Sequence, residues 1–258
     1  MSERYIEFRD VNKSFGEQDV LRDVNFHMNK AETTVILGRS GVGKSVSLKL
    51  ILGFLKPDSG RIVVAGHDVT DFTEAEMMPI RRNVTMVFQA GALFDSLTVA
   101  ENVAFPMQAL KNVPQNKIEG RVAELMQMLE VTEFADKLPA ELSTGTKRAV
   151  AIARALAQDP EAILYDEPTT MVDPLMASHT GDLILKLKGT FHKTSVVVTH
   201  DTHLARRLAD SVIFLHQGRV TFFGTWKEFE TSKDPFIENF RAQDELIPAL
   251  DVTAASDV

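Results

Sequence analysis

The clearest sign of the fold is the segment GRSGVGKS, Gly38 to Ser45. It follows a short apolar run, Thr33 to Gly38, that predicts a buried strand, and it precedes a helix expected from about Lys44 to Leu52. The stretch matches G-x-x-x-x-G-K-[ST] without a gap, and a strand before it and a helix after it are the context that this motif requires. Its glycines let backbone N–H groups curve around phosphate oxygens.

The side chains of this loop suit a nucleoside triphosphate such as ATP with Mg²⁺. Lys44 would bring a positive charge to the β- and γ-phosphates, and Ser45 offers a hydroxyl to Mg²⁺. The alternative is a chance glycine-rich turn before a helix. The other residues expected to line the nucleotide in this loop are Gly38, Arg39, Ser40, Gly41, Val42 and Gly43.

A second apolar strand, in AILYDEP, ends in two carboxylates, Asp166 and Glu167. Adjacent residues of a strand point to opposite faces, so the two acids can take separate roles. We expect Asp166 to hold Mg²⁺ through water and Glu167 to polarise the attacking water. The alternative is a solvated strand end, but Asp and Glu are poor strand formers, so two of them after an apolar run need a reason.

Two further apolar strands end in polar side chains, VTMVFQ at Gln89 and VVVTH at His200. Ligands of parallel sheets gather at the carboxyl ends of the strands. His200 is therefore a candidate donor to a γ-phosphate oxygen, and Gln89 a candidate to orient water or contact Mg²⁺. The alternatives are a structural or exposed histidine and a surface glutamine.

Composition limits the class of protein. The chain has 258 residues, 44% of them hydrophobic, which is enough for a large core. It has no cysteine and a net charge of −8, which argues weakly against broad binding to nucleic acid. The N-terminus lacks the layout of a secretory signal, and no apolar stretch approaches the ~18 residues of a membrane span. We expect a soluble, cytoplasmic protein whose membrane role comes through a partner.

The order of predicted elements gives the fold class. Strands and helices alternate, except from about Leu97 to Leu156, where the period is helical and Ile118, Val122 and Leu125 share one face. This order predicts an α/β protein with a mostly parallel sheet and an all-helical insertion.

Inside the helical block, ELSTGTKRAVAIARAL places small hydroxyl residues and a glycine directly before a basic helix. One interpretation is a helix N-cap at Ser143. The other is a helix end that binds phosphate, where free N–H groups and the helix dipole face an anion. This stretch alone does not separate the two.

The motifs in this order resemble the nucleotide-binding subunit of ATP-binding cassette (ABC) transporters, from about Tyr5 to Trp226. The resemblance implies a P-loop NTPase with a RecA-like parallel sheet, an N-terminal antiparallel β subdomain and a helical subdomain inserted at about 90–157, all within an ATPase domain of residues 1–232. It identifies the P-loop at 38–45, the Q-loop glutamine Gln89, the signature 142–146, the Walker B pair Asp166 and Glu167, the D-loop acid Asp173 and the switch histidine His200.

In that family two subunits face head to tail and sandwich ATP and Mg²⁺ between one P-loop and the other subunit's signature. The resemblance therefore implies that Ser143 and Gly145 contact the γ-phosphate bound by a partner subunit, in a homodimer or in a heterodimer with a related chain. It also implies that Phe15 stacks on adenine in place of the usual tyrosine. The signature departs from LSGGQ at Thr144 and Thr146, and a β-branched Thr144 is tolerable only without a positive φ.

Two segments, Phe88 to Met107 and Gly43 to Gly60, are similar to ATPases of Mla/Mce-type lipid transporters. This resemblance implies phospholipid transport between inner and outer membranes, an integral membrane permease, an Mce-type substrate-binding protein, attachment to the cytoplasmic face of the inner membrane and no nucleic acid partner. Within the first segment, GALF and Phe105 are candidates for the permease contact, or ordinary core.

Three other functions stay open. The chain is alternatively an ABC ATPase with another load, such as lipoprotein release, amino-acid import or cell division. The altered signature also allows a nucleotide-gated structural module with little turnover. A role in nucleic acid or iron–sulfur assembly is disfavoured by net acidity and by the absence of cysteine.

A C-terminal extension, about residues 233–258, follows the motifs. It contains Phe236, Ile237, Phe240, Leu246 and Ile247, enough for a short helix docked on its own or a neighbouring ATPase subunit. The last residues, LDVTAASDV, are expected to be disordered.

Overall fold

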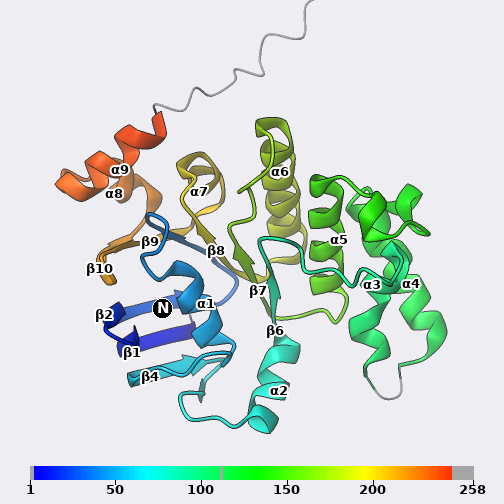
Figure 1. The fold of residues 1–258 in the computed structure, drawn as a ribbon, viewed down its shortest axis with the longest axis horizontal. Helices are drawn as coiled ribbons and strands as arrows, with labels where there is room; N and C mark the ends of the chain where they lie inside the picture. Colours follow the sequence, from blue (N-terminus) through cyan, green and yellow to red (C-terminus); the bar gives the residue numbers. More distant parts are fainter. Residues whose placement is uncertain (1–2, 111–112, 246–258) are drawn as a thin grey trace, which may run out of the picture.

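The computed structural model describes residues 3–110 and 113–245. These residues form two β-sheets with helices around them (Figure 1). The smaller sheet is antiparallel and four-stranded, in the order β2-β1-β4-β5. It confirms the antiparallel β subdomain near the N-terminus, although two of its strands come after the P-loop. Its strands are β1 (Arg4–Phe15), β2 (Gln18–Asn29), β4 (Ser59–Val64) and β5 (His67–Asp68).

The larger sheet has six strands in the order β10-β9-β3-β8-β7-β6. All its neighbours run parallel except the edge pair of β9 and β10. The predicted mostly parallel sheet is therefore confirmed. Its strands are β3 (Thr33–Leu37), β6 (Val84–Val87), β7 (Ala162–Asp166), β8 (Thr194–Thr199), β9 (Ser211–His216) and β10 (Arg219–Gly224).

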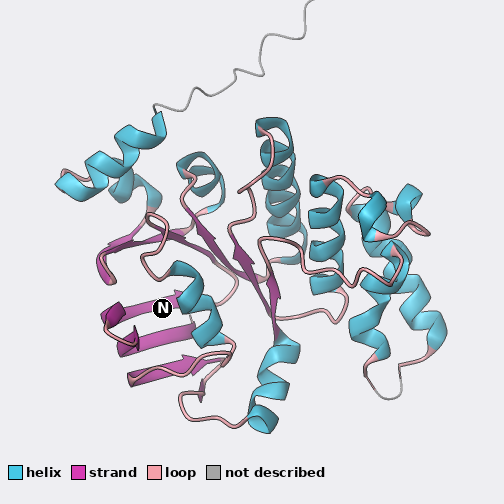
Figure 2. Ribbon diagram, in the orientation of Figure 1, coloured by secondary structure: helices cyan, strands magenta, loops and turns pink. Residues whose placement is uncertain are grey.

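Alternate residues of the parallel strands belong to two different hydrophobic cores. Val35 and Leu37 of β3 pack with the helical block, whereas Ile36 packs with the antiparallel sheet and the helix after the P-loop. Tyr165 and Leu164 of β7 divide in the same way. Because both faces of the sheet are covered (Figure 2), the central strands β3, β7 and β8 are buried at every position instead of at alternate ones.

The helical insertion lies at the β6 edge of the large sheet (Figure 1). The face predicted for Ile118, Val122, Leu125 and Leu129 is buried, as expected. A helix before β6 was not expected, although Thr73 and Glu76 form a capping box at its start. The helices of this region are α2 (Glu74–Asn83), α3 (Val99–Gln108), α4 (Gln115–Met128) and α5 (Thr144–Leu156), with 3₁₀ turns η1 (Thr132–Phe134) and η2 (Pro139–Glu141).

A helix lies in the C-terminal extension, where the sequence predicts one. It is α9 (Pro235–Glu245), and it buries Ile237 and Phe240 in the same core as the helical block. The Phe240 ring centroid lies 5.0 Å from that of Phe214 in β9. Leu246, Ile247 and the tail lie outside the described residues. The remaining helices are α1 (Lys44–Ile51), α6 (Pro174–Phe191), α7 (Thr202–Leu208) and α8 (Trp226–Glu230).

Among the residues that the structure describes, no helix combines the length and the apolar character needed to cross a membrane.

Candidate active site

The loop between β3 and α1 lies close to neighbouring strands, and glycine makes that approach possible. Gly43, at the N-cap of α1, has φ 106°, and a Cβ there would lie 2.5 Å from Cδ2 of Leu21. A Cβ on Gly38 would lie 2.5 Å from the carbonyl oxygen of Leu215 in β9. Any side chain at these two positions would push the loop away from the sheets, so the glycines fix where the loop lies.

Lys44 is almost buried, with 5% of its surface exposed. Its Nζ donates hydrogen bonds to the carbonyl oxygens of Gly38 at 2.8 Å and Arg39 at 3.1 Å. The same nitrogen lies 3.1 Å from Oε1 of Glu167. The ammonium group is thus held at the mouth of the loop by two carbonyls and one carboxylate.

Ser45 and Asp166 form the second contact across the site, because the Ser45 hydroxyl donates to Oδ1 of Asp166 at 2.7 Å. Burial raises the pKa of Asp166, although the hydrogen bond from Ser45 opposes that shift. A hydroxyl and a carboxylate are oxygen ligands of the kind that Mg²⁺ takes, usually together with water and substrate phosphates. Among the described residues no group of three or more His, Cys, Asp or Glu side chains could hold a metal alone. The pair therefore fits Mg²⁺ that arrives with a nucleotide.

Glu167 directly follows β7 and has a left-handed backbone, with φ 47°. Its carboxylate accepts a hydrogen bond from the Thr170 hydroxyl at 3.0 Å, and its Oε2 lies 2.9 Å from Nδ1 of His200. Burial alone would raise the pKa of Glu167, but the hydrogen bond to His200 and the charge of Lys44 outweigh it and lower that pKa. The hydrogen bond to Glu167 raises the pKa of His200. The two adjacent acids have different partners, as expected, although Glu167 lies outside the strand and its direction is set by the turn and not by strand alternation.

These side chains face one pocket with a volume of about 420 Å³, within the usual range for a small-molecule site. Phe15, at the end of β1, lies at its rim and is 47% exposed, so its ring is free to meet a planar base. The pocket is lined by Phe15, Val20, Ser40, Gly41, Gly43, Lys44, Ser45, Val46, Gln89, Glu167, Thr170 and His200.

Other predicted residues lie outside this lining. Gly38, Arg39 and Val42 belong to the loop but not to the pocket wall, and Arg39 donates a hydrogen bond to the side chain of Asn239 in α9 at 3.2 Å. Asp166 reaches the pocket only through Ser45.

The signature and D-loop residues act as helix caps within one chain. The Ser143 hydroxyl accepts a hydrogen bond from the Thr146 N–H at 3.1 Å, and Asp173 accepts one from the Met176 N–H at 3.0 Å. A Cβ on Gly145 would lie 1.8 Å from Cε of Met176, so a larger residue there would displace the flexible Met176 side chain of α6. Thr144 is the first residue of α5 and is absent from the residues with positive φ, which explains how a β-branched residue is accommodated.

Thr170 is the functional side chain that sequence reasoning missed. The signal for it was a hydroxyl three residues after Glu167, within reach of a turn, and Thr170 N–H does bond to the Glu167 carbonyl at 3.2 Å. Val20 and Val46 were also missed, because apolar residues give no sign of which of them face a ligand.

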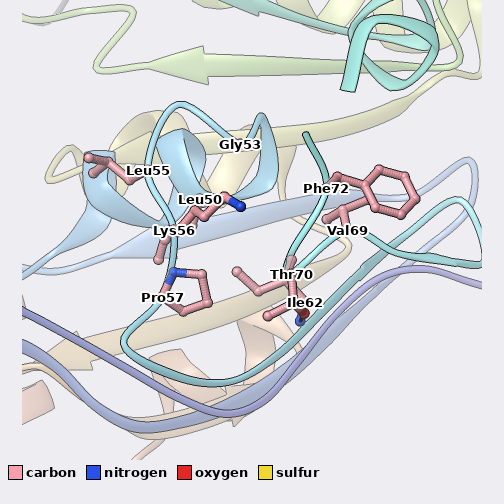
Figure 3. Close-up of a pocket in the computed structure, with 9 residues that line it drawn as sticks. All are labelled: Leu50, Gly53, Leu55, Lys56, Pro57, Ile62, Val69, Thr70 and Phe72. Carbon is pink, nitrogen blue, oxygen red and sulfur yellow. Dashed lines mark hydrogen bonds between the residues drawn. The ribbon is translucent and has the colours of Figure 1, made fainter. Parts of the chain in front are cut away.

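A second pocket between α1 and the antiparallel sheet is much smaller, with a volume of about 10 Å³ (Figure 3). That is room for about one water molecule. Its lining is mostly apolar and includes Leu50, Pro57, Ile62 and Phe72, and none of the residues discussed above belongs to it. It is a packing gap and not a second nucleotide site.

Comparison with known proteins agrees with this geometry. A family model described as "ABC transporter" matches residues 21–170. The chain is 37% identical over 236 residues to a sulfate/thiosulfate import ATP-binding protein, CysA, of Thermosynechococcus vestitus, covering 91% of this chain and 68% of that protein. It is 36% identical over 255 residues to the chloroplast protein TRIGALACTOSYLDIACYLGLYCEROL 3 of Arabidopsis thaliana, covering 93% and 74%.

Solved structures are similar over most of the chain. A dimeric, post-hydrolysis structure of the ATP-binding cassette MJ0796 with ADP and Pi is 34% identical, with a TM-score of 0.78, and the match covers 85% of this chain and 98% of that one. The protein cbiO1 of Clostridium perfringens, part of the ABC transporter complex cbiONQ, is 29% identical with a TM-score of 0.82, covering 95% and 96%.

Proposed function

This chain belongs to the ABC transporter family and is an ATP-binding subunit that hydrolyses ATP with Mg²⁺ to drive transport, and we propose that its load is phospholipid moved between inner and outer membranes. We further propose that two copies sandwich ATP and that a separate permease holds them at the cytoplasmic face of the inner membrane. A substrate-binding protein of Mce type would complete the system.

The observation that carries the catalytic assignment is the convergence of Lys44 and His200 on the two oxygens of Glu167. Triphosphate entering the loop offers Lys44 a stronger anionic partner, which frees Oε1 of Glu167. The carboxylate, still held by His200 and Thr170, then accepts a hydrogen bond from the attacking water and polarises it. Gln89, which lines the same pocket, orients that water.

When Mg²⁺ is bound, it neutralises charge on the β- and γ-phosphates. Ser45 and Asp166 are the residues that would hold it, through the oxygens that now bond to each other. Lys44 adds a fixed charge, and the loop amides from 38 to 45 surround the phosphates. Phe15 offers its exposed ring to the adenine base.

The proposal of a dimer is supported by the position of Ser143 and Gly145, which lie outside the nucleotide pocket of their own chain. Ser143 and Gly145 begin α5, a helix of 13 residues whose N-terminal end carries free N–H groups and a positive dipole, and neither residue lines the pocket of its own chain. A second copy facing head to tail would bring this helix end to the γ-phosphate, with Asp173 beside it at the seam. The related cassette MJ0796 is dimeric with ADP and Pi bound.

An exposed aromatic pair on the helical side is our candidate for the permease contact. Phe94 and Phe105 are 42% and 40% exposed, their ring centroids lie 4.4 Å apart, and the Arg154 guanidinium lies 5.7 Å from the Phe94 ring. Phe94 belongs to the same loop that follows Gln89, so we expect a contact at this pair to affect the pocket through that loop.

Two observations support a lipid load. The segments Phe88 to Met107 and Gly43 to Gly60 are similar to those of Mla/Mce-type lipid transporters, and the Arabidopsis relative carries the name of a galactolipid. Import of a small solute is the second candidate, because the relative from Thermosynechococcus vestitus is named for sulfate and thiosulfate import.

The test is to purify the full chain with its membrane partners in detergent, extract bound lipid, and follow phosphate release. We expect co-purified phospholipid and hydrolysis that requires Mg²⁺. Glu167→Gln should lower turnover by roughly 10²–10⁴-fold while ATP binding persists. A complex without lipid whose hydrolysis rises on adding a solute-binding protein with its solute would favour import instead. Normal turnover in the Glu167→Gln complex would remove Glu167 from its role.

A further inference from the structure

Arg148 lies on the buried face of α5, five residues after the Ser143 cap, and only 4% of its surface is exposed. Its Nη1 donates to the carbonyl oxygen of Pro168, and its Nη2 donates to that of Thr170 and, at 3.4 Å, to that of Gln89. Among the described residues it forms no salt bridge, and its Nε has no hydrogen-bond partner. A buried charge is costly unless it is hydrogen-bonded. Moving any of these carbonyls away would leave the guanidinium poorly bonded, so the carbonyls are held in place.

Each of the three carbonyls belongs to a segment that carries a pocket side chain. Gln89 lines the pocket itself. Pro168 and Thr170 belong to the turn after Glu167, in which the Thr170 hydroxyl bonds the Glu167 carboxylate at 3.0 Å. One guanidinium therefore fixes Gln89 and Glu167 relative to each other and to the helix that begins at the signature.

Arg154, six residues further along α5, supports the same arrangement. It donates to the carbonyls of Ala92 at 2.8 Å and Gly91 at 3.0 Å. Those two residues have positive φ angles of 48° and 76°. The start of the loop after β6 is thus held on α5 at Gln89, Gly91 and Ala92.

We propose that Arg148 is a positioning residue for ATP hydrolysis, setting the distance between Gln89 and Glu167 through the carbonyls of Gln89, Pro168 and Thr170. Arg148 does not line the pocket or touch the nucleotide. Its loss displaces the water-orienting groups and leaves the phosphate-binding loop in place. This inference rests on the roles proposed above for Gln89 and Glu167.

The test compares Arg148→Lys and Arg148→Met in the full assembled complex. A displacement of about 1 Å at reacting groups costs on the order of 10²-fold in rate, so we expect Arg148→Met to lower kcat by roughly that factor. The KM for ATP, and binding of a fluorescent ATP analogue, should change less than about threefold. Arg148→Lys keeps one charge but cannot reach three carbonyls together, and it should restore kcat partly.

Arg121 is the matched control. It is another largely buried arginine of the helical insertion, bonded to Glu124 at 2.8 Å and to the Leu156 carbonyl at 3.3 Å, but it contacts no segment of the pocket. Arg121→Met should lower the melting temperature without lowering kcat per folded complex.

Two outcomes overturn the proposal. One is an Arg148→Lys complex whose kcat equals that of the unaltered protein. The other is an Arg148→Met complex whose kcat and KM change no more than those of Arg121→Met. If Arg148→Met does not fold, Arg148→Lys alone decides by its kcat. Glu167→Gln is measured alongside. Normal turnover in Glu167→Gln would refute the proposed function. Lost turnover in Glu167→Gln together with normal turnover in both Arg148 variants would refute only this inference.

Discussion

Lys44 and Glu167 form a buried ion pair across the nucleotide pocket, with Nζ of Lys44 3.1 Å from Oε1 of Glu167. This pair joins the phosphate-binding loop directly to the residue that follows β7. In the proposed mechanism the Lys44 ammonium group binds the phosphates and the Glu167 carboxylate polarises water. That mechanism therefore couples the binding of ATP to the release of Glu167 from Lys44.

The first prediction concerns the energy of this pair. Removing one member leaves the other charge buried, so Lys44→Met should cost up to about 3 kcal/mol of unfolding free energy. In Lys44→Met the Glu167 carboxylate is left buried without its partner, and Glu167→Gln removes that charge. The variant with both substitutions should therefore lose at least ~1 kcal/mol less unfolding free energy than the two single variants lose together. Urea unfolding of the nucleotide-free protein measures all four corners of the cycle.

The control pair is Lys137 and Glu141, which are about half exposed and 3.1 Å apart. An exposed pair is worth roughly 0.2–1 kcal/mol, so its cycle should show little coupling. Additive losses at Lys44 and Glu167 would mean that the ion pair does not stabilise the empty pocket.

The second prediction is a pH dependence caused by His200. Its pKa is raised from 6.5 by the hydrogen bond to Glu167. A raised folded-state pKa contributes stability that is complete below pH 6.5 and is lost as the pH rises through the folded value. The melting temperature of the nucleotide-free protein should therefore fall across this range.

His200→Gln should make that fall smaller, because the variant has no imidazole to deprotonate. Melting curves at matched ionic strength, from pH 6 upward, provide the measurement. Parallel curves for the two proteins would show that the contact between His200 and Glu167 carries no charge. The pKa of Glu167 is lowered, so its contribution to stability is present above pH 4.5 and is lost only as the pH falls from there through the folded pKa. It does not affect the range above pH 6.

The third prediction concerns the second subunit. The chain has no cysteine, so a pair introduced at Ser143 and Ser40 is the only thiol pair present. In the Glu167→Gln background, a short thiol-specific crosslinker should yield a covalent dimer on a denaturing gel when Mg²⁺ and ATP are present. Both positions are exposed in one chain. Ser143 paired with Ser59, on the antiparallel sheet away from the pocket, serves as the control. Equal crosslinking of both pairs, or none with nucleotide, would contradict the head-to-tail sandwich.

The fourth prediction concerns the C-terminal helix. Phe240 is 7% exposed and packs on Phe214, whereas Phe236, on the same helix, is 52% exposed. Phe240→Ala should cost about 3 kcal/mol of unfolding free energy, the usual loss for a buried phenylalanine. Phe236→Ala should cost under ~1 kcal/mol despite its stacking on His216. Denaturant unfolding measures both, and equal losses would show that α9 does not dock as described.

The features that could be predicted from the sequence are local and lie in contiguous segments. The loop from Gly38 to Ser45 is one unbroken segment between a strand and a helix, and its glycines, lysine and serine act through neighbouring backbone. Asp166 ends an apolar strand and Glu167 follows it, so their place at the carboxyl end of that strand could be predicted. The sheet itself was predictable because strands covered on both faces are apolar throughout.

Contacts between residues far apart in the chain could be found only in the folded structure. No spacing in the chain indicates that Arg148 bonds to Gln89 and Thr170, because those carbonyls are backbone atoms that every residue carries. Nor does it indicate that Lys44 pairs with Glu167 before ATP arrives, or that α9 joins the main core. Such contacts depend on how the strands are ordered in the sheet and on which helix covers each face, and that order is set by the packing of the whole chain and not by any short segment of it.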